Sequence, residues 1–149
     1  MEAVILIGLQ ASGKSTFYRD RFCDSHVRIN LDMLRTRHRE KLLLQACLEM
    51  KQKFVIDNTN PEVCDRQRYI PAAREAGFKV VGYYFQSRLD DLLSRNNSRS
   101  EDRRVPDLAI RGAYSRLVLP SRNEGFDELY YVSLQSPAGF VVKEWDDEV

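Results

Sequence analysis

The stretch Gly8-Leu9-Gln10-Ala11-Ser12-Gly13-Lys14-Ser15-Thr16 is the part of this 149-residue sequence that decides its expected fold. It matches the pattern G-x-x-x-x-G-K-[ST], follows an apolar strand-like run over residues 3–9 and opens a helical pattern over residues 14–22. A strand, a glycine-rich turn and a helix in this order bring backbone N–H groups and the positive end of a helix together. The stretch therefore predicts a binding site for the phosphates of a nucleotide.

The residues of this stretch have distinct expected roles toward ATP. The glycines allow the tight turn, Lys14 should reach the β- and γ-phosphates, and Ser15 should place its hydroxyl on Mg²⁺. Thr16 is expected either as an ordinary helix residue or as a second phosphate contact. The predicted ATP-binding residues are Gly8, Gln10, Ala11, Ser12, Gly13, Lys14, Ser15 and Thr16, with Mg²⁺ accompanying ATP as phosphoryl donor.

A carboxylate follows another strand-like run, residues 54–56, and is a candidate second group at the metal. Asp57 stands where phosphate-binding proteins of this kind hold Mg²⁺ or its water shell. The alternative is a turn-forming role for Asp57, because acids often end strands. Asn60, followed by Pro61, is predicted to cap the next helix.

Short β-rich runs alternate with longer helical patterns, which predicts an α/β fold with a mainly parallel central sheet flanked by helices. Strands are expected over residues 3–9, 27–31, 54–56, 80–85, 129–134 and 140–145. Helices are expected over residues 14–22, 32–51, 61–76, 89–98 and 106–119, with a break near Arg37 and a kink or early break at Pro71. We expect a single domain over residues 1–149, with a C-terminal strand and tail over about residues 127–149.

The composition is typical of a globular chain and gives no sign of a membrane span. Hydrophobic residues make up 43% and charged residues 30%, and the longest apolar run, residues 3–7, is far below the ~20 residues of a spanning helix. Because the first strand-like run begins at once, we expect no signal peptide and a cytoplasmic location. Cys23, Cys47 and Cys64 lack C-x-x-C spacing, so we expect reduced, mostly structural cysteines rather than disulfides or zinc ligands.

Charge is unevenly distributed along the chain, although the net charge is only +1. Residues 88–122 hold eight arginines and no lysine against five acids, whereas residues 124–149 hold one lysine and seven acids. An anionic ligand is therefore expected near residues 88–122. All but six of the 23 basic residues are arginines, whose planar fork suits phosphate, although a compositional bias of the source organism would give the same excess.

A phosphoryl-transfer site needs a group that orients the acceptor hydroxyl and accepts its proton. Asp32 is a candidate because it follows the strand-like run and opens a helical pattern. Arg35, three positions later, is expected on the same helix face, where it would bind an acceptor phosphate. In the alternative interpretation, Asp32 caps the helix and Arg35 is its solvated partner.

A polar loop at residues 99–104, between two predicted helices, is typical of a closing lid. Arg95 and Arg99 are four positions apart, and the expected lid covers about residues 95–106. An arginine delivered by a lid neutralises charge on the transferring phosphoryl group and excludes water. The alternative is an exposed charged helix. Sequence alone does not choose among Arg95, Arg99, Arg103 and Arg104.

Four segments occur in order along the chain: Gly8 to Thr16, Asn30-Leu31-Asp32-Met33-Leu34-Arg35, Val55-Ile56-Asp57-Asn58-Thr59-Asn60-Pro61 and Arg95-Asn96-Asn97-Ser98-Arg99. With them, the sequence resembles the kinase domain of polynucleotide 5′-hydroxyl kinases of the P-loop kinase superfamily, over about residues 1–120. The resemblance implies a P-loop kinase fold with an arginine-bearing lid. It also implies transfer of the ATP γ-phosphate to a 5′-OH end of DNA or RNA.

The resemblance also implies residue roles. Lys14 and Ser15 would serve the ATP phosphates and Mg²⁺. Asp32 would be the general base, Arg35 would bind the acceptor's neighbouring phosphate, and Arg99 would be the lid arginine. The implied catalytic residues are thus Lys14, Asp32 and Arg99.

The sequence departs from the family pattern at two points. It lacks a D-x-D-G-T phosphatase motif, and Gln10-Ala11 replaces the proline or glycine often found in the loop. Related small P-loop kinases of nucleosides, sugars or antibiotics share much of the layout, so a small-molecule alcohol is the alternative acceptor. A nucleotide-binding regulatory module is a third interpretation, which would leave Asp32 and Arg35 without a task.

Overall fold

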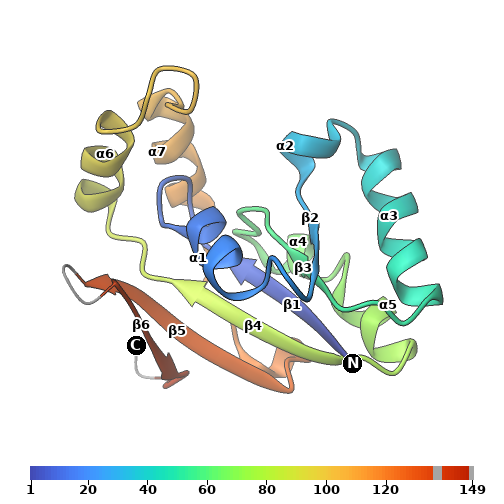
Figure 1. Cartoon of the computed structure of the whole chain (residues 1–149). Helices are drawn as coiled ribbons and strands as arrows, with labels where there is room; N and C mark the ends of the chain where they lie inside the picture. Colours follow the sequence, from blue (N-terminus) through green and yellow to red (C-terminus); the bar gives the residue numbers. More distant parts are fainter. Residues whose placement is uncertain (136–138, 148–149) are drawn as a thin grey trace.

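The computed structural model describes residues 1–135 and 139–147, in which strands and helices alternate along most of the chain (Figure 1). The strands are β1 (Glu2–Ile7), β2 (Val27–Ile29), β3 (Phe54–Ile56), β4 (Lys79–Phe85), β5 (Glu128–Gln135) and β6 (Gly139–Glu144). The helices are α1 (Lys14–Arg21), α2 (Leu31–Leu34), α3 (Arg37–Glu49), α4 (Val63–Arg66), α5 (Ile70–Glu75), α6 (Leu89–Asn97), α7 (Asp107–Arg116) and the short 3-10 helix η1 (Arg122–Glu124). Within the described residues, none of the helices has the length and apolar character needed to cross a bilayer.

One six-stranded sheet, in the order β2-β3-β1-β4-β5-β6, forms the centre of the molecule. The pairs from β2 to β5 are parallel, and β6 pairs antiparallel with β5 at the edge. The predicted α/β fold with a mainly parallel sheet is confirmed. β2 and β3 lie on one side of β1, and the chain then crosses to β4 on the other side. Open α/β sheets bind ligands beyond the carboxyl ends of the strands at such a point.

Both faces of β1 are covered, which explains its nearly continuous apolar sequence. Ile5 packs on the face covered by α3 and α5, in a buried cluster with Leu44. Val4 and Leu6 pack on the opposite face, against Phe17 of α1. Figure 1 shows α1 over the central strands, so its N-terminus is carried to the carboxyl end of β1.

Most predicted strands are confirmed, with ends that differ by one or two residues. β1 ends at Ile7 rather than at residue 9, because Gly8 already belongs to the loop. β2 ends at Ile29 rather than at residue 31, because Leu31 begins α2. The two predicted C-terminal strands form the β5–β6 hairpin. Residues 136–138 and 148–149 of the predicted C-terminal strand and tail lie outside the described residues.

The predicted break near Arg37 is confirmed and separates α2 from α3. Arg35 has a left-handed backbone with φ 77°, which an α-helix does not accommodate. Thr36 then caps the start of α3, because its hydroxyl accepts a hydrogen bond from the Arg39 N–H at 3.1 Å.

The predicted helix at residues 61–76 is two short helices, α4 and α5. Pro71 lies in the first turn of α5, where its missing N–H is no cost, so the predicted early break is confirmed. The predicted capping role of Asn60 is wrong. Asn60 has φ 48°, its side-chain amide donates to Leu6 O at 2.8 Å, and Glu62 is the residue before α4. A left-handed backbone places Asn60 in a turn that ties β1 to the segment after β3.

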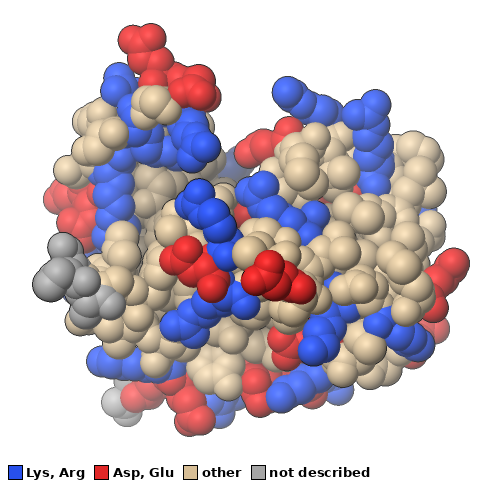
Figure 2. Space-filling model, viewed as in Figure 1, with Lys and Arg blue, Asp and Glu red and all other residues tan. Residues whose placement is uncertain are grey.

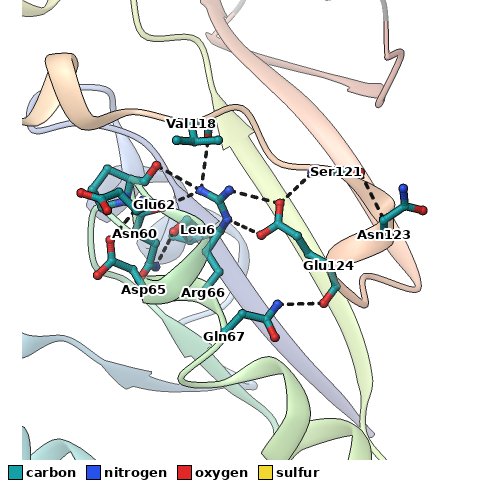
Figure 3. Close-up of polar contacts among 11 residues, drawn as sticks. Leu6, Asn60, Glu62, Asp65, Arg66, Gln67, Val118, Ser121, Asn123 and Glu124 are labelled. Atoms are coloured by element: carbon teal, nitrogen blue, oxygen red, sulfur yellow. Dashed lines mark hydrogen bonds and ion pairs between the residues drawn. The ribbon is translucent and has the colours of Figure 1, made fainter.

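A buried arginine holds this turn to the later part of the chain (Figure 3). Arg66 has no exposed surface, and its Nε donates to Glu124 Oε1 at 2.6 Å. Arg66 Nη1 donates to the carbonyl oxygens of Asn60 at 3.0 Å, Pro61 at 3.2 Å and Val118 at 3.1 Å. One side chain therefore links α4, the turn after β3 and the chain that returns from α7.

Candidate active site

A cavity of about 1200 Å³ lies beyond the carboxyl ends of the parallel strands. Its lining comes from the loop before α1, the ends of β2 and β3 with α2, and the end of α6 with the loop that follows it. α2 and α3 project on one side and α6 and α7 on the other (Figure 1). Figure 2 shows lysine and arginine side chains around the hollow between these two projections.

The loop between β1 and α1 is shaped by two residues with left-handed backbone, Ala11 at φ 67° and Gly13 at φ 102°. Gly13 directly precedes α1, and the first turn of α1 consists of Lys14-Ser15-Thr16, which lines the cavity. First-turn N–H groups have no partner within a helix and carry its positive partial charge. This end of the cavity therefore suits an anion such as phosphate.

Two predicted phosphate-binding residues of this loop, Gly8 and Ser12, are not among the residues that line the cavity. The Gly8 N–H donates to Thr59 O at 3.0 Å. A Cβ at Gly8 would lie 2.8 Å from Phe85 Cβ and 2.8 Å from Ser12 Oγ, so glycine is required there. Within the described residues, the buried Ser12 Oγ has no hydrogen-bond partner. These two residues shape the loop, whereas Gln10, Ala11 and residues 13–16 line the cavity.

Lys14 is a buried cation at the centre of the site, and its Nζ donates to Leu9 O at 2.9 Å. Burial lowers the pKa of Lys14 to about 8. The charge of Arg99 also lowers this pKa, whereas the carboxylates of Asp57 and Asp32 raise it. Groups from the segment after β3, from α2 and from the segment after α6 thus act on the same ammonium group.

Ser15 and Asp57 come together as predicted, with Ser15 Oγ 3.3 Å from Asp57 Oδ2. Hydroxyl and carboxylate oxygens are ligands that Mg²⁺ prefers, and the ion completes its coordination shell with phosphate oxygens and water. The pair therefore fits a magnesium ion. Sequence reasoning missed Arg28 of β2, whose Nε donates to Asp57 Oδ2 at 2.8 Å and whose Nη2 donates to Ser15 Oγ at 3.1 Å.

Two asparagines, also missed from the sequence, fasten the ends of β2 and β3 to each other. Asn30 Nδ2 donates to Asp57 O at 2.6 Å, and Asn58 Oδ1 accepts from the Leu31 N–H at 2.9 Å. Asn58 Nδ2 donates in turn to Glu40 Oε2 of α3 at 3.0 Å. The sequence does show an asparagine shortly after each of these two strands. It does not show which backbone or side-chain group each asparagine contacts.

Asp32 and Arg35 both line the cavity, facing the same space as the loop before α1. The alternative capping role of Asp32 is wrong, because Asn30 is the capping residue and its Oδ1 accepts from the Met33 N–H at 2.9 Å. The predicted shared helix face is also wrong in detail. α2 ends at Leu34 and Arg35 has a left-handed backbone, so the turn, not the helix period, brings Arg35 to the cavity.

The predicted lid segment provides the wall opposite α2. Arg95 and Arg99 line the cavity together with Arg103 and Arg104, although α6 ends at Asn97, before Arg99. Asn96 was missed from the sequence. Its fully buried side chain donates to Val105 O at 2.7 Å and accepts from the Val105 N–H at 3.1 Å, closing the base of the loop.

Comparison with known proteins agrees with this geometry. A family model described as an AAA domain matches residues 4–120, which include the loop before α1, Asp32, Arg35 and the segment between α6 and α7.

Two relatives match almost the whole chain. The bifunctional polynucleotide phosphatase/kinase of Schizosaccharomyces pombe is 28% identical over 152 residues, which is 98% of this chain and 36% of the relative. A related phosphatase/kinase sequence of Acanthamoeba polyphaga mimivirus is 30% identical over 139 residues, which is 89% of this chain and 33% of the relative. The resemblance to polynucleotide kinases is confirmed, and the chain spans about a third of the length of these relatives.

Among solved structures, a gluconokinase from Sinorhizobium meliloti 1021 superimposes with a TM-score of 0.66 at 16% identity, over 91% of this chain and 84% of that chain. This likeness shows a shared fold. The family match over residues 4–120 and the phosphate-binding loop agree, and the chain belongs to the AAA domain family, with the fold of the P-loop kinases.

Proposed function

We propose that this kinase transfers the γ-phosphate of ATP to a 5′-hydroxyl end of DNA or RNA. The observation that carries the proposal is the cavity of about 1200 Å³, which joins the loop before α1, Asp32 with Arg35, and the arginines after α6. A kinase needs a donor site, an acceptor site and a cover that excludes water, all at one place. These three groups of residues have the chemistry for those three tasks.

On the donor side, the loop residues that line the cavity would hold the ATP phosphates. Backbone N–H groups at the start of α1 would contact the phosphate oxygens, and Lys14 would lie against the β- and γ-phosphates. Ser15 and Asp57 would hold Mg²⁺, which when bound spreads the negative charge of the phosphate oxygens.

On the acceptor side, Asp32 would orient the 5′-hydroxyl and accept its proton. The 5′-oxygen then bonds to the γ-phosphorus while the bond from phosphorus to the ADP oxygen breaks. Arg35 would bind the next phosphate of the acceptor strand, and Arg99 would offset the charge on the transferring phosphoryl group. The segment at residues 95–106 would close over the site as a lid.

The lining of the cavity favours a polyanionic acceptor. It includes seven basic residues and only three carboxylates, Asp32, Asp57 and Asp102. ATP phosphates need some of these cations, and the remainder lie on the walls, where the phosphates of a nucleic-acid strand would pass. Both relatives named above are bifunctional polynucleotide phosphatase/kinases by name, which supports the same acceptor. The cytoplasmic location expected from the sequence stays a prediction.

The direct test is transfer of label from γ-labelled ATP to short oligonucleotides. We expect labelling of DNA or RNA that ends in a 5′-hydroxyl, and none of the same strand when it already carries a 5′-phosphate. Gluconate, nucleosides and an aminoglycoside serve as small-molecule acceptors in parallel reactions. Labelling of one of these alcohols without labelling of any oligonucleotide would replace the proposal with the small-molecule alternative.

A further inference from the structure

Arg28 has no part in the function proposed above, yet it touches both groups that we assign to Mg²⁺. Its Nε lies 2.8 Å from Asp57 Oδ2 and its Nη2 lies 3.1 Å from Ser15 Oγ. Its guanidinium carbon also lies 5.9 Å from the centre of the Tyr18 ring. The three contacts come from α1 and from the end of β3, so Arg28 is held at this place from several sides.

The charges explain why an arginine occupies this position. The side chain of Asp57 is only 1% exposed, whereas that of Arg28 is 29% exposed. A buried carboxylate without a partner is strongly disfavoured. Arg28 therefore neutralises Asp57 in the protein without metal.

The same contact opposes a cation at the pair. An ion bound to Ser15 Oγ would lie about 2.1 Å from that oxygen. Because Arg28 Nη2 lies 3.1 Å from the same oxygen, the two positive groups would be within about 5 Å of each other. At this distance, in a partly buried site, a divalent ion and a guanidinium repel each other strongly.

We propose that Arg28 opposes divalent-cation binding at the Ser15–Asp57 pair, so that free cation binds weakly and binds well only together with the nucleotide phosphates. This inference rests on the proposed metal role of Ser15 and Asp57. The phosphates supply the negative charge that offsets Arg28. The site would therefore accept metal with nucleotide rather than metal alone.

The test is a titration of the nucleotide-free protein with Mn²⁺, in which electron paramagnetic resonance counts the free ion. We expect Arg28→Gln, which keeps a hydrogen-bond donor but no charge, to bind Mn²⁺ at least about tenfold more tightly than the wild type. Arg28→Lys, which keeps the charge, should stay within about threefold of the wild type. Arg21→Gln is the matched control, because Arg21 carries the same charge on α1 but contacts the Phe17 ring.

A double variant identifies the site that gains affinity. Adding Asp57→Asn to Arg28→Gln should abolish the gain, and a gain that persists would place the ion elsewhere and overturn the inference. Equal or weaker Mn²⁺ binding by Arg28→Gln would also overturn it. The Mn²⁺ titrations of both variants need no acceptor. Their outcome can therefore be distinguished from a failure of the oligonucleotide labelling assay.

Thermal unfolding covers the case in which Arg28→Gln is unstable because Asp57 has lost its partner. The unfolding temperature of this variant should then rise with millimolar Mn²⁺ by several degrees more than that of the wild type. If the variant is unfolded without metal, Mn²⁺ should restore its folded circular-dichroism spectrum. A variant that Mn²⁺ neither binds nor stabilises contradicts the inference.

Discussion

Asp32 is the residue on which the proposed chemistry depends most directly. It lines the cavity opposite the loop before α1, and its carboxylate acts electrostatically on Lys14. If it accepts the proton of the acceptor hydroxyl, Asp32→Asn should lower kcat about 100- to 10,000-fold. The affinity for ADP should change little, because in the proposed function the ADP phosphates contact the loop before α1 and not Asp32. Single-turnover labelling and calorimetric binding of ADP measure the two quantities.

The matched control for Asp32→Asn is Asp102→Asn, which removes the same charge from the opposite wall of the cavity. We expect this variant to keep kcat within about fivefold of the wild type, since general-base catalysis is lost only at the base itself. A wild-type kcat in Asp32→Asn would show that Asp32 is not the general base. An equal loss of kcat in both variants would show that only the negative charge in the cavity matters, and not the position of the carboxylate.

Lys14 gives a prediction for pH. Burial lowers its pKa to about 8 in the free protein, whereas bound phosphates favour the charged ammonium group. Binding ADP above this pKa therefore requires uptake of a proton. The affinity for ADP should be level near pH 7 and should fall as the pH rises through about 8, by up to about tenfold per pH unit.

Calorimetric titrations from pH 7 to about pH 9.5 would show this profile, and buffers of different ionisation enthalpy would show the proton uptake. Lys14→Arg is the control, because arginine stays charged over the whole range and the profile should be flat even if binding is weaker. A wild-type affinity that does not change up to pH 9.5 would contradict the lowered pKa.

At this scale, the sequence predicted the residues whose role follows from a local pattern. The pattern of strand, turn and helix predicted where Lys14 and Ser15 lie, and the end of a strand predicted Asp57; all three line the cavity, and their roles toward ATP and Mg²⁺ stay predictions. Arg28, Asn30 and Asn58 were missed because their roles depend on partners from other strands. One sequence does not show which strand lies beside which, so a contact such as Arg28 to Asp57 becomes visible only once β2 is known to pair with β3.

At the scale of elements, the loop between α6 and α7 depends on one asparagine. The fully buried side chain of Asn96 pairs with both backbone groups of Val105. Asn96→Ala would leave those groups without partners, which costs about 1–3 kcal/mol. We expect faster hydrogen exchange over residues 98–106 and a lower kcat/KM, measured by mass spectrometry and by the labelling assay.

Asn97→Ala is the control for this loop, because Asn97 is the exposed neighbour of Asn96 on the same helix. It should leave both the exchange rates and kcat/KM close to the wild-type values. Wild-type exchange at residues 98–106 in Asn96→Ala would show that other contacts close the base of the loop.

The lengths of elements were harder to predict than their existence. Hydrophobic periodicity located the two helical regions after β2 and β3, but each consists of two helices. Arg35 and Asn60 adopt left-handed backbone where tertiary contacts demand a turn, and neither residue signals this by itself. Such turns matter for the site, because Arg35 lies at a turn and lines the cavity.

At the scale of the whole molecule, Arg66 and Glu124 hold distant parts of the chain together (Figure 3). Arg66→Met would leave Glu124 buried without its cation, which costs about 3–5 kcal/mol of unfolding free energy. Urea unfolding measures the loss. The control is Arg74→Met, because the ion pair of Arg74 with Asp127 is largely exposed and should contribute less than about 1 kcal/mol.

A second variant separates the buried charge from the lost packing around it. Arg66→Met combined with Glu124→Leu removes both charges, so it should be less destabilised than the sum of the two single variants. Strict additivity would show that Arg66 stabilises the fold mainly through the carbonyl groups of Asn60, Pro61 and Val118.

The distribution of charge over the molecule predicts how acceptor binding responds to salt. The net charge is only +1, so the attraction comes from the basic lining of the cavity rather than from the molecule as a whole. Each phosphate that a cation neutralises adds about 0.7 to the slope of log Kd against log salt for a single strand. The Kd of a 5′-hydroxyl oligonucleotide, measured with ADP present, should therefore rise steeply between about 50 and 200 mM salt.

Arg35→Ala should lower the slope by about 0.7, because one phosphate contact is lost. Arg111→Ala should leave it unchanged, because Arg111 is an exposed arginine of α7 outside the cavity lining. A slope near zero in the wild type would mean that no strand of phosphates lies in the cavity, as expected for a small neutral alcohol.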